Sequence, residues 1–229
     1  MRDDICTIPV SEVFEKNDGC PICRMRDIID ERITDYIMGD AMMKPDVRID
    51  TNKVGFCEFH YDKMLNHRGR LQLSLILQTH IDEINNKIFT KKLFDSDTKK
   101  AENAKKISGT CFICEKTEWG LSRMIDTVYR CYEQERDFRN IFNFQEMFCL
   151  PHYELLINGG KKKIKRYTKE FFDNLTRITG EYSKSLSADL SKFCTMYDYR
   201  NRNVEDGWGN SRNSVERTIA FLNGRQFKK

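Results

Sequence analysis

The sequence predicts an all-α protein, built from two duplicated helical zinc-binding units and a C-terminal helix. Apolar residues recur at three- and four-residue steps along charged segments, which is typical of amphipathic helices. Only four prolines occur in 229 residues, and a Cys-x2-Cys and Cys-x2-His pattern is written twice. Hydrophobic residues make up 39% and charged residues 32%, a balance that indicates a folded helical protein rather than a disordered or sheet-dominated one.

The first unit is expected over residues 1–94. After the first cysteine pair, a helix is indicated by the spacing of Ile29, Ile33, Tyr36 and Ile37. A second, long helix follows the first Cys-x2-His, with an apolar stripe formed by Leu73, Leu77, Ile81, Ile84 and Ile88. His80 lies on this stripe, so it is expected to be a hydrogen-bonded core histidine. Each unit should then run helix, loop, helix, with the cysteine pair opening the first helix and Cys-x2-His opening the second.

Residues 95–110, "DSDTKKAENAKKISGT", are polar and lysine-rich and are expected to form a linker. The second unit, with a C-terminal docking segment and helix, is expected over 111–229. Its first helix is indicated by Trp119, Met124, Ile125 and Val128. Two apolar stretches follow, one before and one after Gly180, and "KKKIKR" (161–166) is expected to be the solvated first turn of their helix. In the tail helix, Asn213 and Glu216 have capping-box spacing, and the apolar face is predicted at Val215, Ile219 and Leu222.

The two units match when the second is shifted by 91 positions. "CPIC" (20–23) then falls on "CFIC" (111–114), and one inserted residue later "GFCEFHYDKMLN" (55–66) falls on "MFCLPHYELLIN" (147–158). The gap between the two motifs is 33 residues in one copy and 34 in the other. Two copies in register indicate an internal duplication.

The repeated cysteines and histidines predict two metal sites. Two sulfurs from a Cys-x2-Cys turn and a sulfur and an imidazole from a helix start complete a tetrahedral Cys3His set, which favours zinc. Taken in chain order, the two sites are Cys20, Cys23, Cys57, His60 and Cys111, Cys114, Cys149, His152. Two Zn²⁺ per chain are therefore expected. Because protein ligands fill all four positions, these sites are expected to be structural and not catalytic.

Three other cysteines, Cys6, Cys131 and Cys194, lie outside the pattern, and Cys131 is expected in a helix core. Residues 197–211 are the other candidate for a function. A candidate ligand pocket there would use Asp198, Arg200, Asn201, Trp208, Asn210 and Ser211. The alternative is a tail loop in which Trp208 anchors the last helix, since Asn, Asp and Gly also serve turns.

The sequence carries no secretory leader and no membrane-spanning apolar run, so a cytoplasmic protein without a membrane partner is expected. Nine cysteines without a secretion signal favour metal binding or redox work over a disulfide framework. The net charge of +4 is mild, so nucleic-acid binding through residues 161–166 and the arginines of 200–225 is only weakly indicated. The partner is otherwise undefined: a protein or a polar ligand.

Several stretches, "CPICR", "DYIMGDAMMKPDVRI", "GFCEFH", "FCLPHY" and "FCTMYDYRN…WGNS…VER", resemble an uncharacterised family of bacterial proteins. This is a domain-of-unknown-function family found mainly in Gram-positive anaerobes, and the resemblance covers nearly all of residues 1–224. It supports the architecture and implies no activity.

The favoured function is a zinc-stapled binding or scaffold module and not an enzyme. Three alternatives stay open. The Cys-x2-Cys pairs could act in thiol redox chemistry or redox sensing, the basic residues could bind nucleic acid, and residues 194–211 could form an enzyme site.

Overall fold

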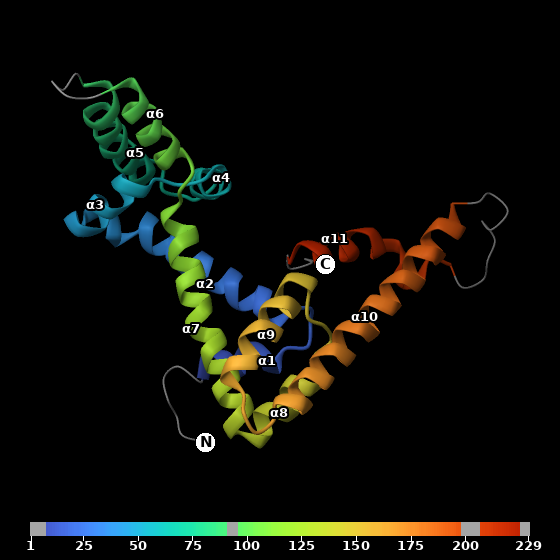
Figure 1. Ribbon diagram of the computed structural model, residues 1–229. Coiled ribbons are helices and arrows are strands. Elements are labelled where there is room, and N and C mark those ends of the chain that lie inside the picture. The colour runs from blue at the N-terminus through green and yellow to red at the C-terminus, as the bar shows by residue number, and fades with distance from the viewer. Residues whose placement is uncertain (1–7, 91–95, 198–206, 225–229) are drawn as a thin grey trace. The chain divides into compact units, whose positions relative to one another are not determined.

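The computed structural model describes residues 8–90, 96–197 and 207–224, and every regular element in these ranges is a helix (Figure 1). The all-α prediction is confirmed for this part of the chain. None of the described helices combines the length and the apolar composition needed to cross a bilayer. In chain order the elements are α1 (Ile8–Glu15), α2 (Pro21–Met38), η1 (Asp40–Met43), α3 (Pro45–Val54), α4 (Glu58–Leu65), α5 (Arg70–Ile84), η2 (Asn85–Phe89), α6 (Asp97–Ser108), α7 (Phe112–Gln134), α8 (Arg136–Asn143), α9 (Leu150–Lys163), α10 (Thr168–Met196), η4 (Gly209–Asn213) and α11 (Ser214–Asn223).

The chain forms two compact units that do not follow the order of the duplication. The inner unit comprises residues 27–121, and the outer unit comprises residues 1–26 together with 122–229. The inner unit is thus an insertion in the outer one, whereas the sequence predicts consecutive units on either side of residues 95–110. The reason lies in two long helices, because the unit boundaries fall within α2 and within α7.

In the inner unit, α3 packs against α5, and α6 packs against η2 and α3. The core is aliphatic and sulfur-rich. Its buried members come from the end of α2, from η1, the α3–α4 junction, α4, α5 and the start of α7, namely Ile37, Met38, Ala41, Phe56, Met64, Leu73, Ile76, Cys111, Phe112 and Ile113. The predicted stripe of the long helix is therefore partly right: Leu73 is buried, while Ile81 is 52% exposed. His80 is a core histidine as predicted, and its Nδ1 lies 3.0 Å from the carbonyl oxygen of Asn52.

The outer unit has an aromatic core between α1, α7, α8 and α10. Phe142 lies at its centre, with ring centroids 4.9 Å from Phe148, 5.0 Å from Tyr132 and 5.1 Å from Phe171. Such ring pairs add stabilisation beyond their buried area. The long helix α10 packs against α9 and α11, which also contact each other (Figure 1). These helices present the second Cys-x2-His motif to the first cysteine pair.

Two local predictions differ from the structure. Residues 97–108 of the expected linker form helix α6, which has no buried residue and begins at Ser96, whose Oγ accepts the backbone N–H of Lys99. Lys161–Lys163 are the last turn of α9 and not the first turn of a new helix, and their charges suit the C-terminal end of a helix dipole. The apolar stretches before and after Gly180 lie mostly in one helix, α10, which is continuous through this glycine.

The predicted face of the tail helix is wrong as well. In α11, Val215, Ile219 and Leu222 are 37%, 52% and 51% exposed, while Ser214 and Phe221 are buried. Asn213 is the N-cap residue, but its side chain caps no backbone N–H. The helix is held by Phe221, whose ring lies 5.9 Å from that of Tyr182, and by Arg217, which donates to Asp189 at 2.7 Å.

Candidate metal centres

Each half of the metal-binding pattern is positioned by a helix start, as predicted. Cys20 and Cys111 directly precede α2 and α7, and Cys23 and Cys114 lie in the first turn of these helices. In the second motif, Cys57 and Cys149 are the N-cap residues of α4 and α9, and His60 and His152 follow three positions later. A side chain before the helix and one a turn later project to the same side, so each motif offers two ligand atoms at once.

The halves combine across the duplication. Cys20 and Cys23 converge with Cys149 and His152, which we call the outer centre, and Cys57 and His60 converge with Cys111 and Cys114, which we call the inner centre. The pairing predicted from chain order is therefore wrong, although the eight residues themselves gather as two Cys3His groups. Each group takes its cysteine pair from one copy and its Cys-x2-His from the other.

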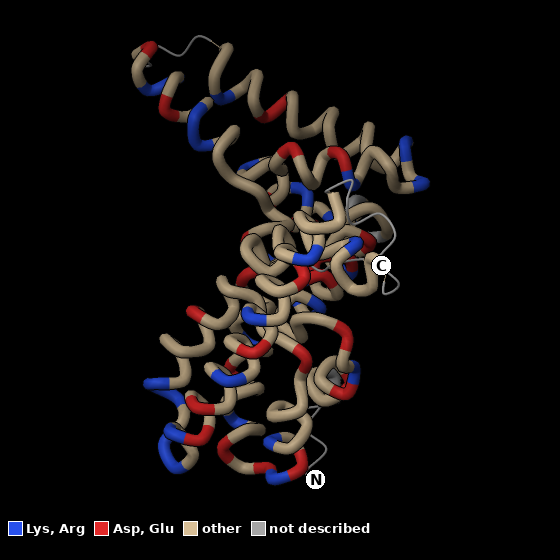
Figure 2. Tube along the Cα trace, turned by 90° about the vertical axis from the view of Figure 1, so that its right-hand side faces the viewer, with Lys and Arg blue, Asp and Glu red and all other residues tan. Residues whose placement is uncertain are grey.

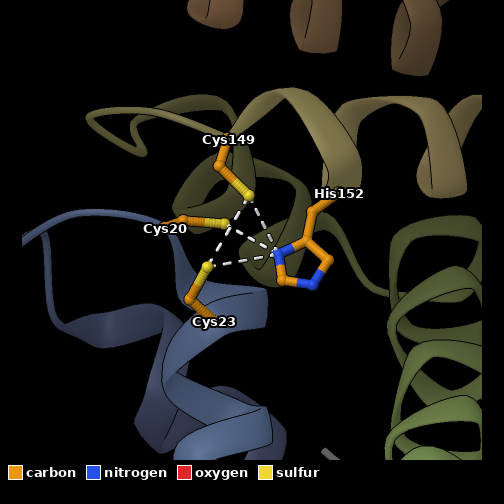
Figure 3. Close-up of side chains that lie close together, drawn as sticks. All are labelled: Cys20, Cys23, Cys149 and His152. Atoms are coloured by element: carbon orange, nitrogen blue, oxygen red, sulfur yellow. Dashed lines mark hydrogen bonds between the residues drawn. The ribbon is translucent and has the colours of Figure 1, made fainter. Parts of the chain in front are cut away.

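The outer centre is fully buried. Nδ1 of His152 lies 3.5, 3.3 and 3.1 Å from the sulfurs of Cys20, Cys23 and Cys149, and the Cys23 and Cys149 sulfurs are 3.6 Å apart (Figure 3). The C-terminal end of α11 covers this group. Gly224, which follows α11 in the left-handed conformation at φ +65°, lies beside this group, since an added Cβ would be in van der Waals contact with the Cys149 sulfur at 3.5 Å. Its carbonyl oxygen accepts a 2.6 Å hydrogen bond from Arg26.

The inner centre has the same geometry but is more exposed, because Cys57 and Cys114 are only half-buried. Nδ1 of His60 lies 3.2, 3.3 and 3.4 Å from the sulfurs of Cys57, Cys111 and Cys114. The two motifs are joined directly by the backbone, since the N–H of Phe112 donates to the carbonyl oxygen of Gly55 at 2.9 Å. Gly55 ends α3 at φ +72°, where a side chain would also meet the ring of His80.

These separations fit a shared tetrahedral ion. With Zn–S bonds of about 2.3 Å and a Zn–N bond of about 2.0–2.1 Å, a tetrahedron has S···S edges of about 3.8 Å and S···N edges of about 3.6 Å. The sulfurs of Cys23 and Cys149 are 3.6 Å apart at the outer centre, and those of Cys57 and Cys114 are 3.8 Å apart at the inner one. The S···N separations run from 3.1 to 3.5 Å. The donor set and its spacing both suit a closed metal site.

The electrostatics of the two groups favour a cation. At the inner centre, burial acts to raise the pKa of the Cys111 thiol, but the hydrogen bond with His60 and the backbone amides of Cys114 and Cys57 lower it to about 6. Burial and the neighbouring Cys111 then raise the pKa of Cys114. At the outer centre, burial acts to raise the pKa of the Cys20 thiol, but its hydrogen bonds with Cys149, Cys23 and His152 outweigh burial and lower it. Cys20 in turn raises the pKa of the Cys149 thiol to about 12. By themselves these thiols resist holding three negative charges together, and a divalent cation would remove that repulsion.

One acid–base network of the inner centre was not predicted from the sequence. Nε2 of His60 donates to Oδ2 of Asp30 at 2.6 Å, and Lys63 donates to Oδ1 of the same carboxylate. Asp30 comes from α2 and is 15% exposed. A difference between the two copies could have indicated this network, because the second copy has Leu121 at the position of Asp30 and Leu155 at the position of Lys63.

The other sequence candidates lie apart from these centres. Of the proposed pocket, Asp198, Arg200 and Asn201 fall outside the described residues. Trp208 packs on α10 with ring centroids 5.4 Å from Phe193 and 5.5 Å from Tyr197. Ser211 is buried and donates to the Trp208 carbonyl, and the Asn210 carbonyl accepts from Arg217. These contacts dock η4 onto α10. Cys131 is buried, as predicted, and Cys194 is exposed on α10.

Basic and acidic residues are interspersed along the described helices (Figure 2). Lys161–Lys163 end α9, and the ammonium of Lys163 lies 3.4 Å from a carboxylate oxygen of Asp126. Glu133 likewise accepts the backbone N–H groups of Lys165 and Arg166. Acidic groups thus already contact part of the "KKKIKR" stretch.

A family model, described as a family of unknown function (DUF6062), matches residues 1–229. The chain belongs to this family. No curated protein and no solved structure matches it. The two Cys3His groups are the chemistry that the geometry of the described residues offers.

Proposed function

We propose that the protein is a two-zinc protein in which both Cys3His centres are closed structural sites, and that it acts in the cytoplasm as a binding or scaffold module rather than as an enzyme. The observation that carries the proposal is the convergence of two sets of four ligand atoms, each within 4.8 Å of one another. Three thiolates and one imidazole favour zinc over harder cations. Four protein ligands leave no coordination position for a substrate.

Metal content and pairing can be tested together by native mass spectrometry of protein purified under reducing, zinc-replete conditions. Two zinc ions are expected in the unmodified chain. Because Cys23 and Cys149 belong to one centre, Cys23→Ala, Cys149→Ala and the double variant should each retain one zinc. Cys23→Ala combined with Cys114→Ala should retain none, because it removes a ligand from each centre.

Cys194→Ala is the matched control, since Cys194 is an exposed cysteine outside both groups, and it should retain both ions. Less than one zinc per unmodified chain would overturn the proposal. Loss of both ions from the Cys23→Ala/Cys149→Ala variant would instead overturn the pairing.

The redox alternative is separated by the reactivity of the thiols. In zinc-loaded protein, the six ligand cysteines should resist alkylation until a chelator removes the metal, because a bound thiolate is a poor nucleophile towards other reagents. Equal alkylation rates with and without the chelator would favour redox chemistry at the cysteine pairs.

A further inference from the structure

The two centres differ in what holds their histidine. At the inner centre the His60 ring is fixed from both sides, by three sulfurs on Nδ1 and by the Asp30 carboxylate 2.6 Å from Nε2. The His60 side chain is 3% exposed and that of Asp30 is 15% exposed, so water competes little for this bond. Within the described residues no carboxylate pairs with His152 of the outer centre.

Asp30 is itself held in place. Lys63, one turn after His60 on α4, bonds the second carboxylate oxygen and is 30% exposed. The three side chains therefore form a chain from the metal-binding nitrogen to a cation, across helices α2 and α4. Because Lys63 neutralises Asp30, the network adds orientation at His60 with little net charge.

We propose that Asp30 is a positioning residue that raises the metal affinity of the inner centre. The two centres therefore retain their metal for different structural reasons. The inner centre depends on the Asp30–Lys63 pair, and the outer centre depends on burial beneath α11. This inference rests on the proposed zinc function. Outer carboxylates that fix a ligating imidazole typically contribute 10- to 100-fold to metal affinity.

The test is a chelator competition on the full-length, zinc-loaded chain. After equilibration with increasing EDTA, a short alkylation pulse and peptide mapping report which cysteines have lost their metal. In Asp30→Leu, which introduces the residue of the second copy, Cys57, Cys111 and Cys114 should become reactive at about 10- to 100-fold lower chelator concentration. Cys20, Cys23 and Cys149 should be unchanged.

Asp30→Asn separates positioning from folding, because its amide oxygen can still accept from Nε2. It should recover part of the lost affinity. In protein loaded with ¹¹¹Cd, Asp30→Leu should shift one of the two metal resonances, and Asp30→Asn should shift the same resonance less.

A matched control lies on the same helix. Asp35 also pairs with a histidine, at 3.2 Å from His67, but His67 is not in either group. Asp35→Leu should leave all six thiols protected as in the unmodified chain. The inference would be overturned if Asp30→Leu left the chelator concentration that exposes the inner cysteines unchanged, or lowered it equally at both centres. Either result would leave the zinc proposal intact. An unmodified chain that binds no zinc would overturn both.

Discussion

Gly159 and Gly160 allow α9 to approach aromatic side chains of the outer unit. A Cβ at Gly159 would lie 2.8 Å from Cζ of Tyr129, and one at Gly160 would lie 2.9 Å from Cε1 of Phe171. Both distances are shorter than a carbon–carbon contact permits. The Tyr129 hydroxyl also donates to the carbonyl oxygens of Leu155 and Leu156 at 3.3 Å, so the ring cannot retreat without losing these bonds.

Gly159→Ala should therefore lower the free energy of unfolding by about 1–3 kcal/mol, the usual cost of overpacking a core. Gly180→Ala is the matched control, because Gly180 lies within α10 and an added Cβ meets nothing within 4 Å. It should raise stability by about 0.4–1 kcal/mol. Urea denaturation of both variants in zinc-replete buffer measures the two effects, and equal changes would contradict the packing argument.

At the residue scale, the eight members of the two centres were predictable because each half-site is local. Cys-x2-Cys and Cys-x2-His need only a turn and a helix start, and these are encoded within a few residues. Asp30 was not predictable in this way, since its partner His60 lies 30 positions away. Asp30 is one of several acidic residues in α2, and the sequence alone does not distinguish it from a solvated charge.

The start of α10 is organised by an element distant in sequence. Glu133, near the end of α7, accepts the backbone N–H groups of Lys165 and Arg166 at 3.1 and 2.8 Å. Tyr167, the N-cap residue of α10, provides no capping side chain. A carboxylate from α7 thus satisfies amides that precede the helix, where negative charge is favourable.

Glu133→Gln should weaken this anchor in a pH-dependent way. Burial acts to raise the pKa of the Glu133 carboxyl, but the hydrogen bonds from the backbone N–H groups of Arg166 and Lys165 outweigh burial and lower this pKa. A group whose folded-state pKa is lowered stabilises the protein above its unfolded pKa, and this contribution is lost as the pH falls through the folded value. At pH 7 the variant should be less stable by about 0.5–1 kcal/mol, a capping value reduced for solvent screening.

The deficit should begin to shrink near the ordinary pKa of a glutamate, about 4.3, and disappear below the lower pKa that Glu133 has in the folded state. Thermal unfolding of the two proteins between pH 3 and pH 8 measures it. A deficit that does not change with pH would assign the loss to packing and not to charge.

At the element scale, helix identity followed from periodicity, but helix ends and buried faces did not. Residues 97–108 have too few apolar side chains to predict burial, yet their exposed helix needs none, because it is capped and rich in good helix formers. In α11 the stripe of aliphatic side chains lies outward, because Arg217 and Phe221 anchor another face of the helix. Polar anchoring of this kind does not appear in a hydrophobic pattern.

For the whole molecule, the pairing of half-sites was the decisive unknown. Two cysteine pairs and two Cys-x2-His motifs can combine in two ways, and all four half-sites have the same local geometry. The pairing predicted from chain order did not take the lengths of α2 and α7 into account. Helix α2 starts at the first cysteine pair and its 18 residues rise about 27 Å, so the chain leaves that pair before α3 packs on α5. The 23 residues of α7 have the same effect after the second pair.

Crosswise pairing gives each unit one metal centre and one core. Removing the metal of one unit should therefore reduce the protection from hydrogen exchange in that unit and not in the other. The inner centre closes a loop within residues 27–121, and the outer centre joins the two segments of the outer unit. In hydrogen exchange, Cys57→Ala/Cys114→Ala should raise exchange in α4, α5 and α6 while α8 and α10 stay protected, because local opening follows cooperative units. Cys23→Ala/Cys149→Ala, as the reciprocal control, should raise exchange in α9 and α11 and leave α5 protected. Equal loss of protection in both units after either double substitution would show that the metals stabilise a single cooperative structure. Loss of protection in only the substituted unit would show that the duplicated motifs are divided between two cooperative units.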